Sequence, residues 1–207
     1  MISELVDIAF PSICLACGQK PKPLCEQCIP EFGIHTESEA SIFAAELGEE
    51  LSSILSAFKD KNRVALTRPL AIGLRPALLA AIELLSPTII VCPPSSRRNF
   101  RKRGFNPALR LFRAANTTPL IVTDRLLRLK FQPRDQRGLD RWERSTNLQD
   151  AFVARPTKHR VLLADDVATT GATLTAATRA LESAGAKVVG SCVLARRFSI
   201  SSHSESN

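Results

Sequence analysis

Short apolar runs alternate with amphipathic stretches across the second half of the chain. Four short apolar runs predict strands, at Thr88–Cys92, Leu120–Val122, Arg160–Ala164 and Lys187–Leu194. They lack a regular apolar–polar alternation, which is typical of strands covered on both faces. Between the last two runs, one apolar face predicts a helix that Gly185 would end: Leu174, Ala177, Leu181 and Ala184. Because a strand, a helix of about 12 residues and a second strand form a βαβ unit, the pattern predicts a parallel sheet flanked by helices and an α/β fold.

An earlier periodicity predicts an amphipathic helix within residues 35–60. Its apolar residues recur at intervals of three and four: Phe43, Leu47, Leu51, Ile54, Leu55 and Phe58. The chain then divides into a cysteine-rich segment (1–32), a linker that carries this helix (33–60), the α/β domain (61–198) and a Ser-rich tail (199–207). We expect the tail to be disordered.

Composition and charge narrow the class of protein. A chain of 207 residues, 44% apolar and 23% charged, is typical of a soluble globular protein with a sizeable core. No apolar run approaches the roughly 18 residues of a membrane-spanning helix, so we expect no membrane span. Residues Met1–Phe10 hold no basic residue, unlike an export signal, and we expect a cytoplasmic protein. A net charge of +8 favours binding of polyanions, a phosphorylated ligand or nucleic acid, although solubility alone also explains it.

Four of the six cysteines form two CxxC pairs near the N-terminus: Cys14, Cys17, Cys25 and Cys28. Each pair places two thiolates on one side of a tight turn, and two pairs complete a closed tetrahedral site. In a reducing cytosol this spacing predicts a structural metal rather than disulfides, with zinc expected and iron accepting the same ligands. Incidental cysteines and a redox dithiol pair are the alternatives. Cys92 and Cys192 lie in predicted buried strands, and we expect no chemistry from them.

An acid pair and a Thr-rich turn join the third predicted strand to the predicted helix. Asp165 and Asp166 come at the carboxyl end of the strand, where open α/β sheets bind ligands. The turn offers hydroxyl groups and a flexible glycine just before the helix N-terminus, which suits a phosphate: Thr169, Thr170, Gly171 and Thr173. Two carboxylates repel a phosphate but accept hydrogen bonds from vicinal hydroxyl groups. The pattern therefore predicts a phosphorylated sugar as ligand.

A basic segment follows the first predicted strand and should lie at the same edge of the sheet. Its cations are Arg97, Arg98, Arg101, Lys102 and Arg103. A pyrophosphate group or a nucleic-acid backbone would suit these cations, and Phe100 and Phe105 would permit base stacking. A solvated basic loop without a ligand is the alternative. No GxxxxGK[ST] motif occurs, which argues against a nucleoside triphosphatase.

The stretch Val161–Thr173 (VLLADDVATTGAT) resembles the ribose-phosphate signature of type I phosphoribosyltransferases. The resemblance implies that Asp165 and Asp166 are the catalytic pair on the ribose hydroxyls. It places the 5′-phosphate among Ala168, Thr169, Thr170, Gly171, Ala172 and Thr173. It also implies phosphoribosyl pyrophosphate as the ligand, with Mg²⁺ held mainly by that ligand.

The whole chain resembles the ComF family, named for bacterial competence for DNA uptake. The motifs occur in the family's order: the CxxC pairs, Phe58-Lys59, the basic segment ending RGFN, the Gln136–Phe152 stretch and the DDVATTGAT loop. The resemblance implies that Lys59 and the basic segment serve pyrophosphate or nucleic acid. Asp60 and the Val91–Ser95 stretch depart from the family pattern, which has an aromatic residue after the lysine and Val-Pro-Val-Pro at the strand end.

Two functions follow from these expectations. The first is a phosphoribosyltransferase whose acceptor the sequence does not identify. The segment that selects the acceptor would come from residues 37–61 and from the cysteine-rich segment. The second is a non-catalytic accessory protein that binds single-stranded DNA or a DNA-uptake helicase, with phosphoribosyl pyrophosphate as a regulatory ligand. No cysteine is placed as the nucleophile of a glutaminase reaction, since the N-terminal cysteines have metal-ligand spacing.

Overall fold

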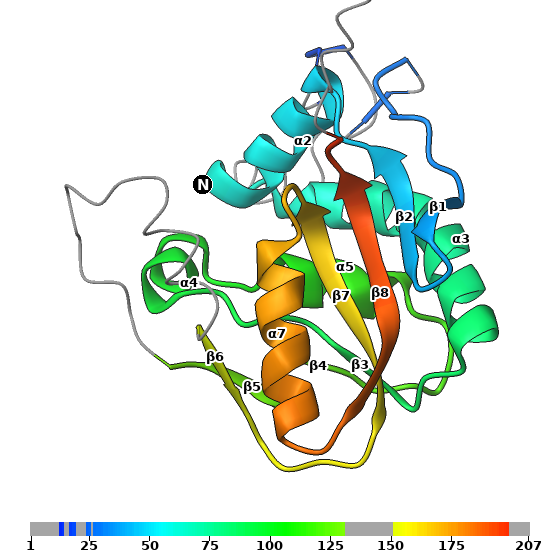
Figure 1. The fold of residues 1–207 in the computed structure, drawn as a ribbon. Coiled ribbons are helices and arrows are strands. Elements are labelled where there is room, and N and C mark those ends of the chain that lie inside the picture. The colour runs from blue at the N-terminus through cyan, green and yellow to red at the C-terminus, as the bar shows by residue number, and fades with distance from the viewer. Residues whose placement is uncertain (1–12, 15–16, 20–23, 26, 131–150, 199–207) are drawn as a thin grey trace, which may run out of the picture.

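A six-stranded, mostly parallel sheet organises the chain in the computed structural model (Figure 1). The structure describes residues 13–14, 17–19, 24–25, 27–130 and 151–198. The strand order is β1 (His35–Ser38), β2 (Ser41–Glu46), β8 (Lys187–Arg196), β7 (Arg160–Ala168), β3 (Ile89–Val91) and β4 (Val122–Thr123). Only the β1–β2 pair is antiparallel among these. Two further strands, β5 (Leu127–Leu129) and β6 (Phe152–Ala154), form a separate antiparallel ribbon.

Helices cover both faces of the sheet, which confirms the predicted α/β class. One face packs against α3 (Thr67–Leu85), which follows the short η1 (Val64–Leu66), and against α5 (Pro107–Ala115). The opposite face packs against α7 (Ala172–Ser183) and the β5–β6 ribbon. Helix α2 (Glu49–Asp60) lies beyond the carboxyl ends of β7 and β8, and α4 (Arg97–Arg103) follows β3 (Figure 1). Both helices therefore lie near the carboxyl ends of parallel strands.

Within the part of the chain that the structure describes, one helical segment, Val64–Leu85, is long and apolar enough to cross a membrane. No single apolar run produces this, because Arg68 and Arg75 interrupt the segment. Its buried side chains include Leu70, Leu74 and Leu78, which are part of the main hydrophobic core. The segment thus has the packing of a core helix in this fold.

The predicted strands and the C-terminal helix are confirmed, with shifted ends. Strand β4 begins two residues later than predicted, and β7 continues to Ala168 rather than ending at Ala164. The predicted helix is confirmed as α7, and Gly185 follows it with φ of +90° and donates its N–H to the Glu182 carbonyl. The predicted tail (199–207) and the Gln136–Phe152 motif up to residue 150 lie outside the described residues.

The prediction of one helix within residues 35–60 is wrong for its first half. Residues 35–46 form the β1–β2 hairpin, and the helix begins only at Glu49. Strand β2 is buried on both faces from Ile42 to Ala45. An unbroken apolar run has no period of its own, so Phe43 matched the helix spacing by chance. The segment 33–60 therefore adds two strands to the central sheet besides its helix.

The turn between β1 and β2 lies directly against β8. The N–H of Ser191 donates to the Ala40 carbonyl over 2.8 Å. A Cβ at Gly190 would lie 2.4 Å from that same carbonyl oxygen, so only glycine permits the contact. This contact holds the β1–β2 hairpin against β8, the strand that pairs with β7.

Candidate functional site

The acid pair lies inside strand β7, near its carboxyl end. Hydrogen bonding to β8 extends the strand past both aspartates, with Asp165 opposite Val193 and Ala168 opposite Arg196. Asp165 is half-buried, and its Oδ1 accepts the N–H of Asp166 over 2.8 Å. Asp166 is 7% exposed. The strand therefore places two carboxyl groups at the carboxyl edge of the sheet, as the sequence predicts.

Asp165 resists ionisation in this position. Burial, followed by the charge of the adjacent Asp166, raises the pKa of Asp165 from 3.8 to about 8. At neutral pH and without a ligand, Asp165 therefore keeps its proton beside the Lys59–Asp166 ion pair. A carboxyl and a carboxylate side by side can both donate and accept hydrogen bonds, which suits a vicinal diol.

This raised pKa predicts that the protein loses stability as the pH rises. Asp165 keeps its proton in the folded state up to about pH 8 but loses it near 3.8 when unfolded, so the unfolded state binds fewer protons between these values. The stabilisation is complete below pH 3.8 and is lost through this window. We expect Asp165→Asn to match the wild-type melting temperature at a pH below 3.8 and to exceed it at pH 8. Thermal melts at both values check this, and equal pH dependence in the two proteins would contradict it.

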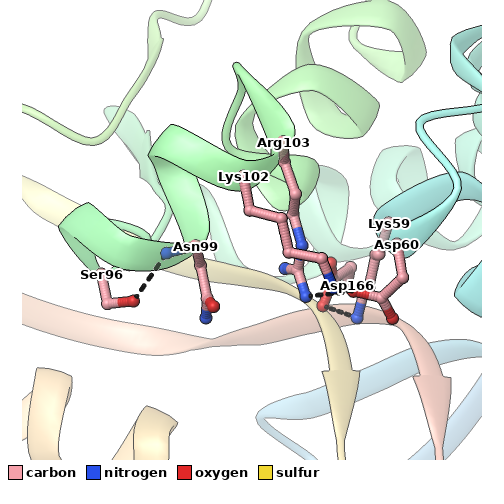
Figure 2. A network of polar contacts seen from close by, with 7 residues as sticks. All are labelled: Lys59, Asp60, Ser96, Asn99, Lys102, Arg103 and Asp166. Atoms are coloured by element: carbon pink, nitrogen blue, oxygen red, sulfur yellow. Dashed lines mark hydrogen bonds and ion pairs between the residues drawn. The ribbon is translucent and has the colours of Figure 1, made fainter.

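Lys59 reaches the acid pair from the last turn of α2. Its Nζ lies 2.8 Å from Oδ1 of Asp166, and the two side chains are only 19% and 10% exposed (Figure 2). The sequence predicts Lys59 near the ligand, although on pyrophosphate rather than on the carboxylates. In the structure the ammonium neutralises Asp166. A diol that binds here must therefore share Asp166 with Lys59.

The predicted phosphate loop connects β7 to α7. Ala168 ends the strand, Thr169 and Thr170 are exposed, and the helix begins at Ala172. Gly171 is the N-cap residue with φ of +73°, a conformation that side chains disfavour. Because glycine has no side chain to cap the first turn, the amides of Ala172 and Thr173 depend on the loop or a ligand for partners. Thr170 Oγ1 accepts from the Ala172 N–H at 3.3 Å.

The basic segment is a short helix, α4, rather than a loop. Ser96 caps it by accepting from the Asn99 N–H (Figure 2). Gly104 ends it with φ of +75°. Asp60, the residue after Lys59, forms ion pairs with Arg103 at 3.1 Å and Lys102 at 3.4 Å. Burial alone would raise the pKa of Asp60, but hydrogen bonds from Arg103 and Lys102 outweigh it and lower that pKa. Asp60 thus fastens α4 to α2 beside the acid pair.

The remaining predicted cations lie on the exposed surface of α4. Arg97, Arg98 and Arg101 are exposed, and Phe100 between them is 51% exposed. The structure therefore divides the basic segment in two. Lys102 and Arg103 pair with Asp60. Arg97, Arg98 and Arg101 form the exposed part of the helix, together with Phe100.

The four N-terminal cysteines converge as their spacing predicts. The Sγ atoms of Cys14, Cys17, Cys25 and Cys28 all lie within 4.8 Å of one another. Cys17 Sγ and Cys25 Sγ are 3.7 Å apart. Zn–S bonds of 2.3 Å in a tetrahedron give an S–S edge of about 3.8 Å, so the cluster fits a zinc site. Hydrogen bonding with Cys17, then Cys25, raises the pKa of Cys28, so metal binding here would release protons.

Other residues of this edge were missed by the sequence predictions. Asn106 is buried, donates to the Pro93 carbonyl at 2.9 Å and to Asp124 Oδ2 at 3.3 Å, and caps α5. Arg196 ends β8 next to the phosphate loop. The sequence could have indicated Arg196, because it follows the predicted strand Lys187–Leu194 at its carboxyl end. Cys92 and Cys192 are buried, and burial raises the pKa of both thiols.

Comparison with known proteins agrees with this geometry. Residues 144–205 match the phosphoribosyl transferase domain family. The chain contains a phosphoribosyltransferase domain. The matched part of this domain includes the acid pair, the phosphate loop, α7 and β8. The chain is also a distant homologue of Competence protein F of Haemophilus influenzae, with 27% identity across 91% of this chain and 92% of that protein.

Proposed function

We propose that this chain binds phosphoribosyl pyrophosphate with Mg²⁺ at the carboxyl edge of its sheet and transfers the phosphoribosyl group. One observation carries the proposal. Asp165 and Asp166 lie near the carboxyl end of the buried strand β7, and a short loop connects this strand to α7, whose N-cap residue is Gly171. A carboxyl pair for two hydroxyl groups and a helix N-terminus for a phosphate match the two ends of ribose 5-phosphate. The match to the phosphoribosyl transferase domain family covers these residues.

The chemistry of such a transfer is mainly electrostatic. The bond from the sugar to pyrophosphate breaks while positive charge develops on the ribose, and Mg²⁺ bound with the ligand would neutralise the leaving group. Asp166, whose Oδ1 pairs with Lys59 Nζ at 2.8 Å, lies where it would stabilise positive charge on the sugar. Lys59 and α4 supply cations on the side of the leaving group. The acceptor would enter from the side of α2, which lies beyond the strand ends (Figure 1).

Binding and transfer require separate tests. Calorimetric titration with phosphoribosyl pyrophosphate and Mg²⁺ tests binding. Release of pyrophosphate on addition of nucleobases or amines tests transfer and identifies the acceptor class. Binding without release for any acceptor would support a ligand sensor in place of an enzyme.

A second function, in single-stranded DNA binding, is favoured by the exposed half of α4. Three arginines and an exposed phenylalanine lie within five residues, a combination that serves backbone contact and base stacking. The name of the Haemophilus influenzae relative points to competence. We propose that DNA, and with it a DNA-uptake helicase, is bound on this surface, with phosphoribosyl pyrophosphate then serving as a regulatory ligand.

Salt dependence tests this DNA surface. For single strands, log affinity falls with log salt by about 0.7 for each phosphate neutralised. Replacing Arg97, Arg98 and Arg101 by Gln should therefore flatten the slope by about 2. Fluorescence anisotropy with a labelled oligonucleotide at several salt concentrations measures it.

The control for that experiment removes the same charge elsewhere. Arg68, Arg128 and Arg179 are exposed and lie outside α4, and replacing all three by Gln should change the slope far less. Equal slopes for the two triple variants would show that DNA responds only to net charge, and would remove α4 as the binding surface.

A further inference from the structure

Arg196 at the end of β8 is held against the phosphate loop. It lies opposite Ala168 in the β7–β8 ladder, and the N–H of Arg197 donates to the Ala168 carbonyl over 2.9 Å. A Cβ built on Gly171 would lie 3.5 Å from Nη1 of Arg196. The guanidinium group therefore lies beside the turn at Gly171, where the absence of a side chain leaves space next to Nη1.

The guanidinium group is only partly satisfied. Its Nη2 forms an ion pair with Oε1 of Glu37, on the hairpin strand β1. Its Nε is buried and has no hydrogen-bond partner among the described residues. The side chain of Arg196 is 16% exposed, whereas that of Glu37 is 34% exposed. The Arg196 guanidinium group is thus mostly desolvated, and its one counter-ion, Glu37, is itself accessible to solvent. Because Nη1 lies on the side of the loop, the group can bind a second anion there.

We propose that Arg196 binds the phosphate group of the sugar phosphate in the Thr169–Thr173 loop, with Glu37 as the competing partner of its guanidinium group. This inference rests on the proposed function, since it names a further ligand of the same site. The planar fork of Arg can hold a phosphate oxygen through Nη1 while Nη2 keeps Glu37, or the whole fork can turn and give both nitrogens to the phosphate. The arrangement also connects the β1–β2 hairpin to ligand occupancy, because phosphate binding weakens the hold on Glu37.

Substitutions at the two ends of the ion pair should act in opposite directions. Arg196→Gln removes a charged hydrogen-bond donor, and we expect ribose 5-phosphate to bind about 10- to 100-fold more weakly. Glu37→Gln removes the competitor, and we expect binding to tighten about two- to fivefold. Arg196→Lys keeps the charge without the fork and should fall between wild type and Arg196→Gln. If the Arg196–Glu37 ion pair only holds the hairpin in place, Arg196→Gln and Glu37→Gln should instead weaken binding to a similar degree.

Calorimetry with ribose 5-phosphate on the full chain measures these affinities, and two controls define the site. Arg197→Gln removes the same charge at an exposed neighbour and should leave the affinity unchanged. Pyrophosphate with Mg²⁺ should bind Arg196→Gln as it binds wild type. Should Arg196→Gln fail to fold, tightening by Glu37→Gln still supports the inference, and unchanged affinity in Glu37→Gln overturns it.

Failure of the inference and failure of the proposed function give different results. Wild-type binding of ribose 5-phosphate that Arg196→Gln retains in full would overturn the role of Arg196 and leave the proposed function standing. Absence of binding by the wild type of both ribose 5-phosphate and phosphoribosyl pyrophosphate would overturn both.

Discussion

Replacing Asp165 and Asp166 together by Asn should abolish binding of ribose 5-phosphate. Asn keeps the size and one oxygen of each side chain, so the β7–β8 pairing stays intact. The variant loses the carboxylate of Asp166, whose two oxygens would accept from the ribose hydroxyls, at about 1.5–3 kcal/mol for each hydrogen bond to charge. For two such bonds the affinity should fall by a factor of about 100 or more, which calorimetry measures directly.

The Lys59–Asp166 ion pair requires its own control. Asp166→Asn also removes the partner of Lys59, which is 19% exposed, so some loss of stability accompanies the loss of the carboxylate. Lys59→Gln breaks the same ion pair and keeps both carboxyl groups. With ribose 5-phosphate, which has no pyrophosphate for Lys59 to contact, Lys59→Gln should bind at least as well as wild type. Equal losses in Lys59→Gln and the double Asn variant would remove the carboxyl pair as the sugar site.

Removing one cysteine of the N-terminal cluster should release its metal. We propose that the purified chain holds one zinc ion at the single site formed by Cys14, Cys17, Cys25 and Cys28. Cys25→Ala leaves three sulfur ligands and opens the tetrahedron, so elemental analysis should find zinc reduced to background. Because metal binding is folding free energy for such a site, the melting temperature of the variant should fall as well.

A cysteine outside the cluster provides the comparison. Cys192 is buried in β8 and is not one of the four clustered cysteines, so Cys192→Ala should keep the full zinc content. The same elemental analysis distinguishes zinc from iron. Unchanged metal content after replacement of both Cys14 and Cys25 would show that the cluster does not bind the metal.

The local parts of the site could be predicted from the sequence. Asp165, Asp166 and the loop to Thr173 lie in one continuous segment, and a strand followed by a helix fixes their positions without reference to the rest of the chain. The four cysteines also lie within fifteen residues, so their spacing alone predicts that they converge. Chemistry encoded by a short spacing can be derived from residue types alone.

The contacts between distant segments could not be predicted in this way. Lys59 and Asp166 are 107 residues apart, and Glu37 and Arg196 are 159 apart, so only the folded sheet brings them together. Asp60 stands where the family that the sequence resembles has an aromatic residue, and its ion pairs with α4 give this aspartate a structural role here. Strand β2 was mistaken for helix because burial on both faces removes the alternation that identifies a strand.

Calorimetric titration of the wild-type chain with phosphoribosyl pyrophosphate, with and without Mg²⁺, tests the central claim most directly. The geometry predicts saturable binding at one site per chain that strengthens when Mg²⁺ is present and is prevented by excess ribose 5-phosphate. The absence of saturable binding at millimolar ligand and Mg²⁺, with the protein folded and its zinc retained, would contradict a phosphoribosyl site at the end of β7.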